Sequence, residues 1–184
     1  MVAANHPEGL VLVTGPSRGG KSQWAEHLVS FCSEVTYVAT SPSFPEDESW
    51  QERLRLHRER RPPTWSLLEC DGQLTSALEE APENHALLID ALGSFTAAYL
   101  QNDAEQWNAV QNDLLITLKQ RRQPVVIVIE ETGWGVVPPT AIGGLFRDRQ
   151  GQLAQRLARQ ANRSWLVVQG RALDLHALGQ TIPL

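Results

Sequence analysis

The stretch Gly15–Ser22, GPSRGGKS, combines residue types that bind phosphate. It fits the pattern G-x-x-x-x-G-K-[ST], which ends here in Lys21 and Ser22. Glycines let successive backbone N–H groups point into one concavity, and the helix that follows adds its positive end. In such a loop the lysine reaches the β- and γ-phosphates and the hydroxyl binds Mg²⁺. The stretch therefore predicts a site for ATP or GTP, made of Gly15, Pro16, Ser17, Arg18, Gly19, Gly20, Lys21 and Ser22.

Acidic residues that could complete a magnesium site follow two apolar runs. Asp90 ends ALLID, and Glu130 and Glu131 follow VVIVI. A carboxylate at the end of a strand is often only solvated, but a phosphate-binding loop needs an acid near its metal ion. We favour Asp90 as the magnesium ligand and keep Glu131 as a further candidate. No cluster of His and Cys has the spacing of a zinc site.

Apolar runs alternate with segments of helical period. Because continuously apolar strands separated by helices are typical of a parallel sheet covered on both faces, we predict an α/β fold like that of P-loop NTPases, mainly parallel, as a single domain over 1–184. The expected strands are Leu10–Gly15, Val35–Thr40, Ala86–Asp90, Val125–Glu130 and Trp165–Gln169. The expected helices are Lys21–Cys32, Asp103–Arg121 and Gly144–Asn162. The breaks Thr40–Ser49, Arg61–Thr64 and Glu131–Thr140 are expected near the carboxyl edge of the sheet, where ligands bind.

A polar helix rich in arginine is expected to begin at Glu48 and to end before Pro62, and it contains His57. Taken alone, such a segment is most simply a solvated face with Arg–Glu pairs. A histidine among arginines has another use, because imidazole can attack phosphorus while guanidinium groups neutralise the phosphates. That chemistry requires the helix to lie near the glycine loop or to swing towards it.

These segments together resemble one family. The chain resembles the bifunctional adenosylcobinamide kinase / adenosylcobinamide-phosphate guanylyltransferases of cobalamin synthesis over about Leu10 to Leu175. The segments that carry the resemblance are, in order, TGPSRGGKSQWAE, TYVAT, RLRLHRERRPPTW, LLIDALGSF, IEETGWGVVP and LFRDRQGQLAQRLA. A glycine loop alone is weak evidence for a family. Its combination with H-R-x-x-R-P-x-x-W and G-x-G-x-V-P is highly specific.

The resemblance implies two reactions. The family phosphorylates adenosylcobinamide with ATP or GTP, then transfers GMP from GTP to that phosphate through a covalent histidine, which falls on His57. Lys21 is the second catalytic residue, and Ser22, Asp90 and Glu131 are the metal ligands. Arg58, Arg61, Glu69 and Asp90 join the loop as nucleotide-binding residues, with Arg53 as a further phosphate contact. The implied partners are adenosylcobinamide, its phosphate and the nucleotides, and trimers are known in the family.

The sequence also departs from the family pattern. Gly19 precedes Gly20 where serine is usual, Ser49 stands where an acid is usual, and Leu67 replaces a common threonine. Ala98 and Ala154 occupy positions that usually hold asparagine. These changes touch polar positions that could contact nucleotide or corrinoid. Trp134 could contact a corrinoid or pack against the core.

Two other functions remain open at this point: a P-loop kinase for another small molecule, with His57 as a surface residue, and a nucleotide-binding protein without catalysis. Nucleic-acid binding is disfavoured, because the net charge is −5 and few aromatic residues lie among the arginines. No apolar run approaches the roughly 20 residues of a membrane span. The N-terminal residues lack a signal-peptide pattern and Cys32 and Cys70 are isolated, so we expect a cytoplasmic protein.

Overall fold

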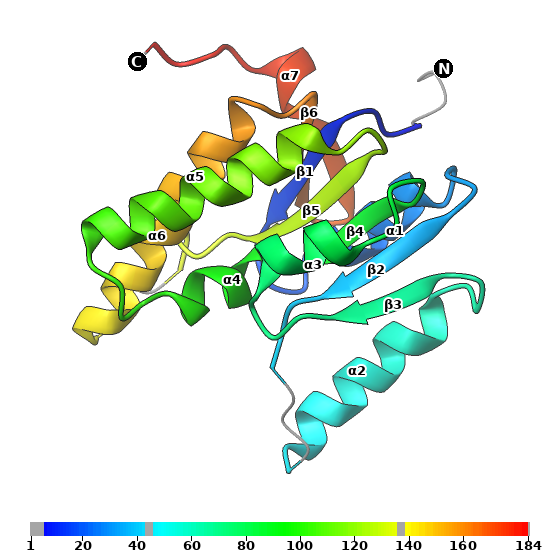
Figure 1. Cartoon of the computed structure of the whole chain (residues 1–184), viewed down its shortest axis with the longest axis horizontal. Coiled ribbons are helices and arrows are strands. Elements are labelled where there is room, and N and C mark those ends of the chain that lie inside the picture. The colour runs from blue at the N-terminus through cyan, green and yellow to red at the C-terminus, as the bar shows by residue number, and fades with distance from the viewer. Residues whose placement is uncertain (1–5, 43–45, 136–138, 184) are drawn as a thin grey trace.

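The computed structural model describes residues 6–42, 46–135 and 139–183, and its strands form one seven-stranded sheet within them (Figure 1). The strands are β1 (Leu10–Gly15), β2 (Val35–Ala39), β3 (Ser66–Glu69), β4 (Ala86–Asp90), β5 (Val125–Glu130), β6 (Arg163–Val168) and β7 (Arg171–Asp174). The helices are α1 (Lys21–Val29), α2 (Glu48–Arg60), α3 (Leu74–Glu80), α4 (Leu92–Ala98), α5 (Ala104–Gln120), α6 (Ala141–Ala158) and α7 (Leu175–Leu178).

The strand order β3-β2-β4-β5-β1-β6-β7 places β1 inside the sheet, between β5 and β6. Neighbouring strands are parallel except for β6 and β7, which form an antiparallel pair. In the register of β1 with β5, Gly15 lies opposite Glu130. The carboxyl ends of β1, β5 and β4 therefore bring the glycine loop and the predicted acids to one edge of the sheet.

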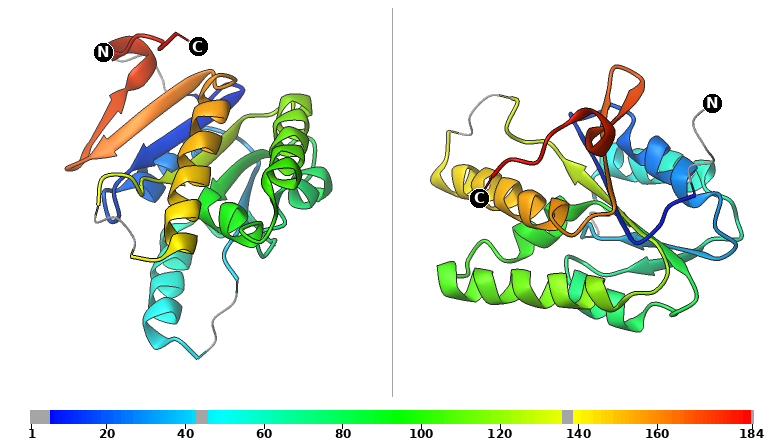
Figure 2. Two further views of the ribbon diagram at one scale, coloured as in Figure 1. Left: turned by 90° about the vertical axis from the view of Figure 1, so that its left-hand side faces the viewer. Right: turned by 90° about the horizontal axis from the view of Figure 1, so that it is seen from above.

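Both faces of the sheet are buried, which explains why the central strands are continuously apolar. On one face, alternate strand residues such as Leu12 and Ile127 pack with α3, α4, α5 and α6. On the other face, Val13 and Val128 pack with α1. The two views of Figure 2 show the helices on either side of the sheet, with α2 projecting beside the edge strand β3. The predicted α/β architecture is confirmed.

Several elements differ from the prediction. The sequence patterns did not reveal β3, α3, α4, β7 or α7, since each has only four to seven residues, too few for a clear period. Helix α6 begins at Ala141 rather than Gly144 because Oγ1 of Thr140 caps it, accepting a hydrogen bond from the Gly143 N–H at 3.2 Å. The placement of the Arg61–Thr64 break was wrong: it leads into the amino end of β3, because Ser66 pairs with Thr36 at the start of the parallel ladder. None of the described helices is both long and apolar enough to cross a membrane.

Candidate active site

The glycine loop between β1 and α1 has a backbone that other residues could not adopt. Gly15 has a φ of 150°, and a Cβ there would lie 2.2 Å from the carbonyl oxygen of Val167 on β6. Gly20, just before α1, has a φ of 96°. A turn closes between them, in which the Gly19 N–H donates to the Pro16 carbonyl at 3.1 Å. The loop is thus packed against β6 and opens towards the start of α1.

Lys21 is the first residue of α1 and is buried, with 8% of its surface exposed. Its Nζ donates to the Pro16 carbonyl at 2.8 Å, so the ammonium lies across the concave side of the loop. Ser22 follows in the first turn of the helix and is half-buried. The ammonium of Lys21 and the start of α1 therefore lie together at the loop, the arrangement that favours an anion at the amino end of a helix.

Asp90 lies at the carboxyl end of β4, and neighbouring side chains fix its position. The Tyr37 hydroxyl donates to Oδ2 of Asp90 at 3.0 Å. Burial, followed by the negative charge of Asp90, raises the pKa of Tyr37, so the phenol stays a hydrogen-bond donor. The next residue, Ala91, donates its N–H to Oγ1 of Thr40 at 2.9 Å, and the same hydroxyl donates to the Ala91 carbonyl at 2.6 Å.

Glu130 is held by a network that the sequence analysis did not find. Its Oε2 accepts hydrogen bonds from the Gly93 N–H at 2.9 Å and from Nε2 of Gln150 at 3.4 Å. Gln150 in turn accepts a bond from the Thr96 hydroxyl at 2.5 Å. A Cβ at Gly93 would come within 2.9 Å of the carboxylate, so the glycine makes room for it. Burial raises the pKa of Glu130. No local motif marks Gln150, which is one polar residue among many in α6.

Glu131 begins the loop after β5 and is tied to the glycine loop through its backbone. Its N–H donates to the Gly15 carbonyl at 3.0 Å, and its Oε1 accepts a bond from the Gly133 N–H at 2.7 Å. Trp134, further along this loop, is 61% exposed and does not pack into the core.

A cavity of about 770 Å³ joins these groups. Its lining unites residues predicted from separate stretches of the chain: Ser17, Arg18, Lys21, Arg58, Arg61, Glu69, Asp90 and Glu131. Glu130 and Tyr37 also line it. Eight of the positions named from the sequence thus border one space, whereas Gly15, Pro16, Gly19, Gly20 and Ser22 are not among its lining residues.

Helix α2 borders this cavity through Leu54 and Arg58, and Arg61 follows at its end. The Arg61 guanidinium lies over the Tyr37 ring, 3.8 Å from its centroid. Arg60 forms an ion pair with Glu26 of α1 at 3.1 Å, and Arg58 lies 4.0 Å from a Glu69 oxygen. His57 and Arg53 are part of α2, but their side chains lie outside the described part of the structure.

The sequence profile of the cobinamide kinase / cobinamide phosphate guanyltransferase family matches residues 11–175. The chain belongs to this family. It is 34% identical over 177 residues to the bifunctional adenosylcobalamin biosynthesis protein CobU of Salmonella typhimurium (strain LT2), covering 88% of this chain and 96% of the relative. The CobU protein of Escherichia coli K12 is 32% identical, with the same coverage of both chains. A solved structure from Pyrococcus horikoshii OT3, 6% identical with a TM-score of 0.54, covers 92% of this chain and 87% of its own, and shares the fold.

The oxygen atoms at the edge of the sheet suit Mg²⁺. Asp90 and Glu131 would supply carboxylates, and Ser22 a hydroxyl. Magnesium sites in nucleotide enzymes likewise use one or two carboxylates, completed by phosphate oxygens and water. Within the described residues, no three His, Cys, Asp or Glu side chains gather as a metal cluster. The donor set therefore fits an ion that arrives with the nucleotide.

The departures from the family pattern fall in different environments. Leu67 is 49% exposed and lines the cavity, so its change alters the surface that a ligand meets. Ala98 lies exposed at the end of α4. Ala154 packs against the core beside α5, away from the cavity. The side chain of Ser49 lies outside the described residues.

Proposed function

We propose that this member of the family phosphorylates adenosylcobinamide with ATP or GTP and then transfers GMP from GTP to the new phosphate through a guanylyl group on His57. The observation that carries the proposal is the single cavity that joins the glycine loop, Asp90 and the arginines of α2. Both steps act on a nucleoside triphosphate, so one phosphate site can serve both.

In the kinase step, the N–H groups of the loop and Lys21 hold the phosphates, with Arg18 at the cavity wall. Ser22 and Asp90, with Glu131, would hold Mg²⁺, which neutralises charge on the transferring phosphoryl group. The hydrogen bond from the Tyr37 hydroxyl would hold the Asp90 carboxylate in place for metal binding. The acceptor oxygen bonds to the terminal phosphorus, the bond from that phosphorus to the bridging oxygen breaks, and a nucleoside diphosphate leaves.

In the guanylyl step, the neutral imidazole of His57 attacks the α-phosphorus of GTP and pyrophosphate leaves. Position 57 comes three residues after Leu54 and four before Arg61, both of which line the cavity, so we expect the histidine to reach the same space. The guanidinium groups that line the cavity would stabilise charge on the phosphates, and Glu69 borders the same space. A phosphate oxygen of adenosylcobinamide phosphate then attacks phosphorus, and the P–N bond breaks.

The proposal is tested by intact-protein mass after incubation with GTP and Mg²⁺. We expect the wild-type protein to gain the mass of one GMP through an acid-labile, base-stable bond. His57→Asn should lose this adduct and keep phosphorylation of adenosylcobinamide, because that step needs no covalent intermediate. His176→Asn, an exposed histidine of α7, is the matched control and should be labelled like wild type.

Labelling of His57→Asn would overturn the role of His57. Nucleotide binding without either reaction would favour a catalytically silent protein, and turnover of other hydroxyl compounds alone would favour a different small-molecule kinase. The trimer implied by the resemblance stays a prediction, which sedimentation equilibrium would check.

A further inference from the structure

A second, smaller cavity of about 440 Å³ adjoins the main one on the side away from the glycine loop. We call it the side cavity. Its lining residues are Ser41, Pro42, Asp71, Gly72, Ser94, Ala97 and Ala98. All of these except Gly72 and Ala98 also line the main cavity, so the two spaces are continuous.

The walls of the side cavity are fixed by backbone contacts. Gly72 is buried with a φ of 78°, and a Cβ there would come 2.8 Å from the Cβ of Ala98, so the turn after β3 packs directly on α4. The Gly72 N–H donates to the Thr40 carbonyl at 2.8 Å. The hydroxyls of Ser41 and Ser94 lie 3.3 Å apart where the two cavities meet. The space is therefore formed before any ligand binds.

The charges of the two cavities differ. The main cavity contains Lys21 and Arg18 for phosphate, together with several carboxylates. The side cavity has no basic residue in its lining, and Asp71, which lines both cavities, is its one charged lining residue. Among the described residues, the Asp71 carboxylate has no recorded hydrogen bond or ion pair. A carboxylate repels phosphate, so the side cavity suits a neutral or cationic group, and Ala97 and Ala98 suit its carbon atoms.

We propose that the side cavity binds the hydroxyl-bearing side chain of the phosphoryl acceptor and that Asp71 accepts the proton of this hydroxyl. The inference rests on the proposed kinase step and names the place of its second substrate. Asp71 lines both cavities, so a hydroxyl bound in the side cavity would face the space proposed for the phosphates. As the acceptor oxygen bonds to the terminal phosphorus and the diphosphate leaves, the hydroxyl proton passes to Asp71 and then to water. The ring of a corrinoid is too large for this space and must lie outside it.

Filling the side cavity tests the binding part of the proposal. Ala98→Leu changes an exposed residue at the end of α4 that lines the side cavity and not the main one, and it should leave the fold intact. We expect KM for adenosylcobinamide to rise about 10-fold, because the acceptor binds more weakly. The KM for ATP and the labelling of the protein with GMP from GTP should stay unchanged. Ala109→Leu, the same change on the exposed side of α5, is the control and should behave as wild type. Equal KM values for the two variants would overturn the assignment.

Asp71→Asn tests the proton acceptor. Asparagine tolerates the φ of 42° at this position and keeps a hydrogen-bond acceptor, so the turn should persist. We expect kcat of the kinase step to fall about 100-fold, the lower end for a positioned proton acceptor, while KM for ATP and GMP labelling stay unchanged. An unchanged kcat would overturn the role of Asp71. If the wild-type protein does not phosphorylate adenosylcobinamide, the proposed function fails and this inference with it; if it does and the variants match it, only this inference fails.

Discussion

The glycine loop and helix α2 border the same cavity but are held in different ways. The loop is fixed by buried backbone: Gly15 abuts the Val167 carbonyl, and its own carbonyl accepts a bond from Glu131. Helix α2 is held near its C-terminal end by Arg60 on Glu26 and by Arg61 on the Tyr37 ring. We therefore expect phosphates to meet a rigid surface. The proposed acceptor of GMP is carried on a helix whose contacts with the rest of the protein, among its described side chains, include the long side chains of Arg58, Arg60 and the following Arg61.

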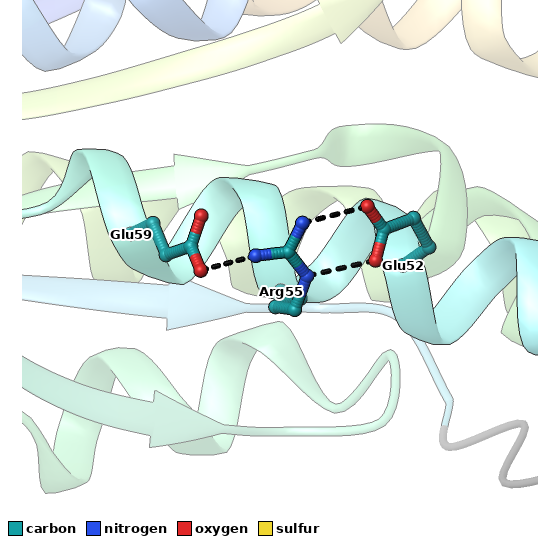
Figure 3. Close-up of polar contacts among 3 residues, drawn as sticks. All are labelled: Glu52, Arg55 and Glu59. Carbon is teal, nitrogen blue, oxygen red and sulfur yellow. Dashed lines mark hydrogen bonds and ion pairs between the residues drawn. The ribbon is translucent and has the colours of Figure 1, made fainter.

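Among the described side chains of α2, Arg58 also reaches Glu69 of β3 at 4.0 Å, whereas the contacts of Arg55 lie within the helix itself. Arg55 contacts Glu52 at 2.7 Å and also Glu59, all within the same helix and all exposed (Figure 3). Pairs of this spacing favour helix formation but do not attach the helix to the sheet. The comparison therefore predicts large effects for changes in the loop and small ones for changes along α2.

The largest effect is expected for Gly15→Ala. A methyl group 2.2 Å from a backbone oxygen cannot be accommodated without moving β6 or the loop. We expect a loss of about 3 kcal/mol in the free energy of unfolding, as for overpacked cores, and loss of nucleotide binding, measured by denaturant unfolding and titration calorimetry. Gly151→Ala on α6 is the control, because a Cβ there meets nothing, and it should be neutral or slightly stabilising. Equal stability and equal nucleotide binding of the two variants would contradict the conclusion that the glycine loop is rigidly packed against β6.

Asp90→Asn should have the next largest effect, since it keeps the shape of the side chain and removes its charge. We expect at least a 100-fold lower kinase rate and a much weaker dependence on Mg²⁺, because the metal neutralises charge on the phosphates. Tyr37→Phe removes the hydrogen bond to Asp90 and leaves the carboxylate, so its loss should be smaller. A normal rate with a normal Mg²⁺ response would move the metal ligand to Glu130 or Glu131.

Arg60→Ala should separate the two reactions. It removes the ion pair to α1 and leaves the loop intact, so we expect GMP labelling to slow several-fold while phosphorylation of adenosylcobinamide is nearly unchanged. A double-mutant cycle with Glu26→Gln should give a coupling of about 0.5–1 kcal/mol, as for a partly exposed pair. Equal slowing of both reactions would show that the ion pair between Arg60 and Glu26 also supports the kinase site.

Arg55→Ala should have the smallest effect. Its partners are exposed and lie within α2, so we expect no measurable change in Tm or in either reaction. Thermal unfolding followed by circular dichroism is sufficient to check this. A clear fall in Tm would mean that α2 contributes more to the stability of the protein than its contacts indicate.

The sequence predicted the parts of the fold that local patterns determine. The strand, glycine turn and helix around Lys21 follow one another directly in the sequence, so a local pattern is sufficient to predict them. The continuously apolar strands indicate a sheet that is buried on both faces. By contrast, Glu130, Gln150 and Thr96 meet from three elements, 20 and 54 residues apart along the chain. Tyr37 looked like one more buried strand residue, although its hydroxyl reaches Asp90. Such contacts depend on strand order and helix packing, which no short pattern specifies. The role of His57 stays a prediction.

The position of β1 inside the sheet also determines when the phosphate site can form during synthesis. β1 leaves the ribosome well before its partners, which begin at Val125 on β5 and near Arg163 on β6. The loop that follows β1 also rests on Val167. Pairing across so much intervening chain is slow and leaves an apolar strand exposed meanwhile. A nascent chain therefore carries its glycine-loop motif without a formed site until β5 and β6 have been made. A product truncated before Arg163 would keep the motif but lack the strand against which it folds.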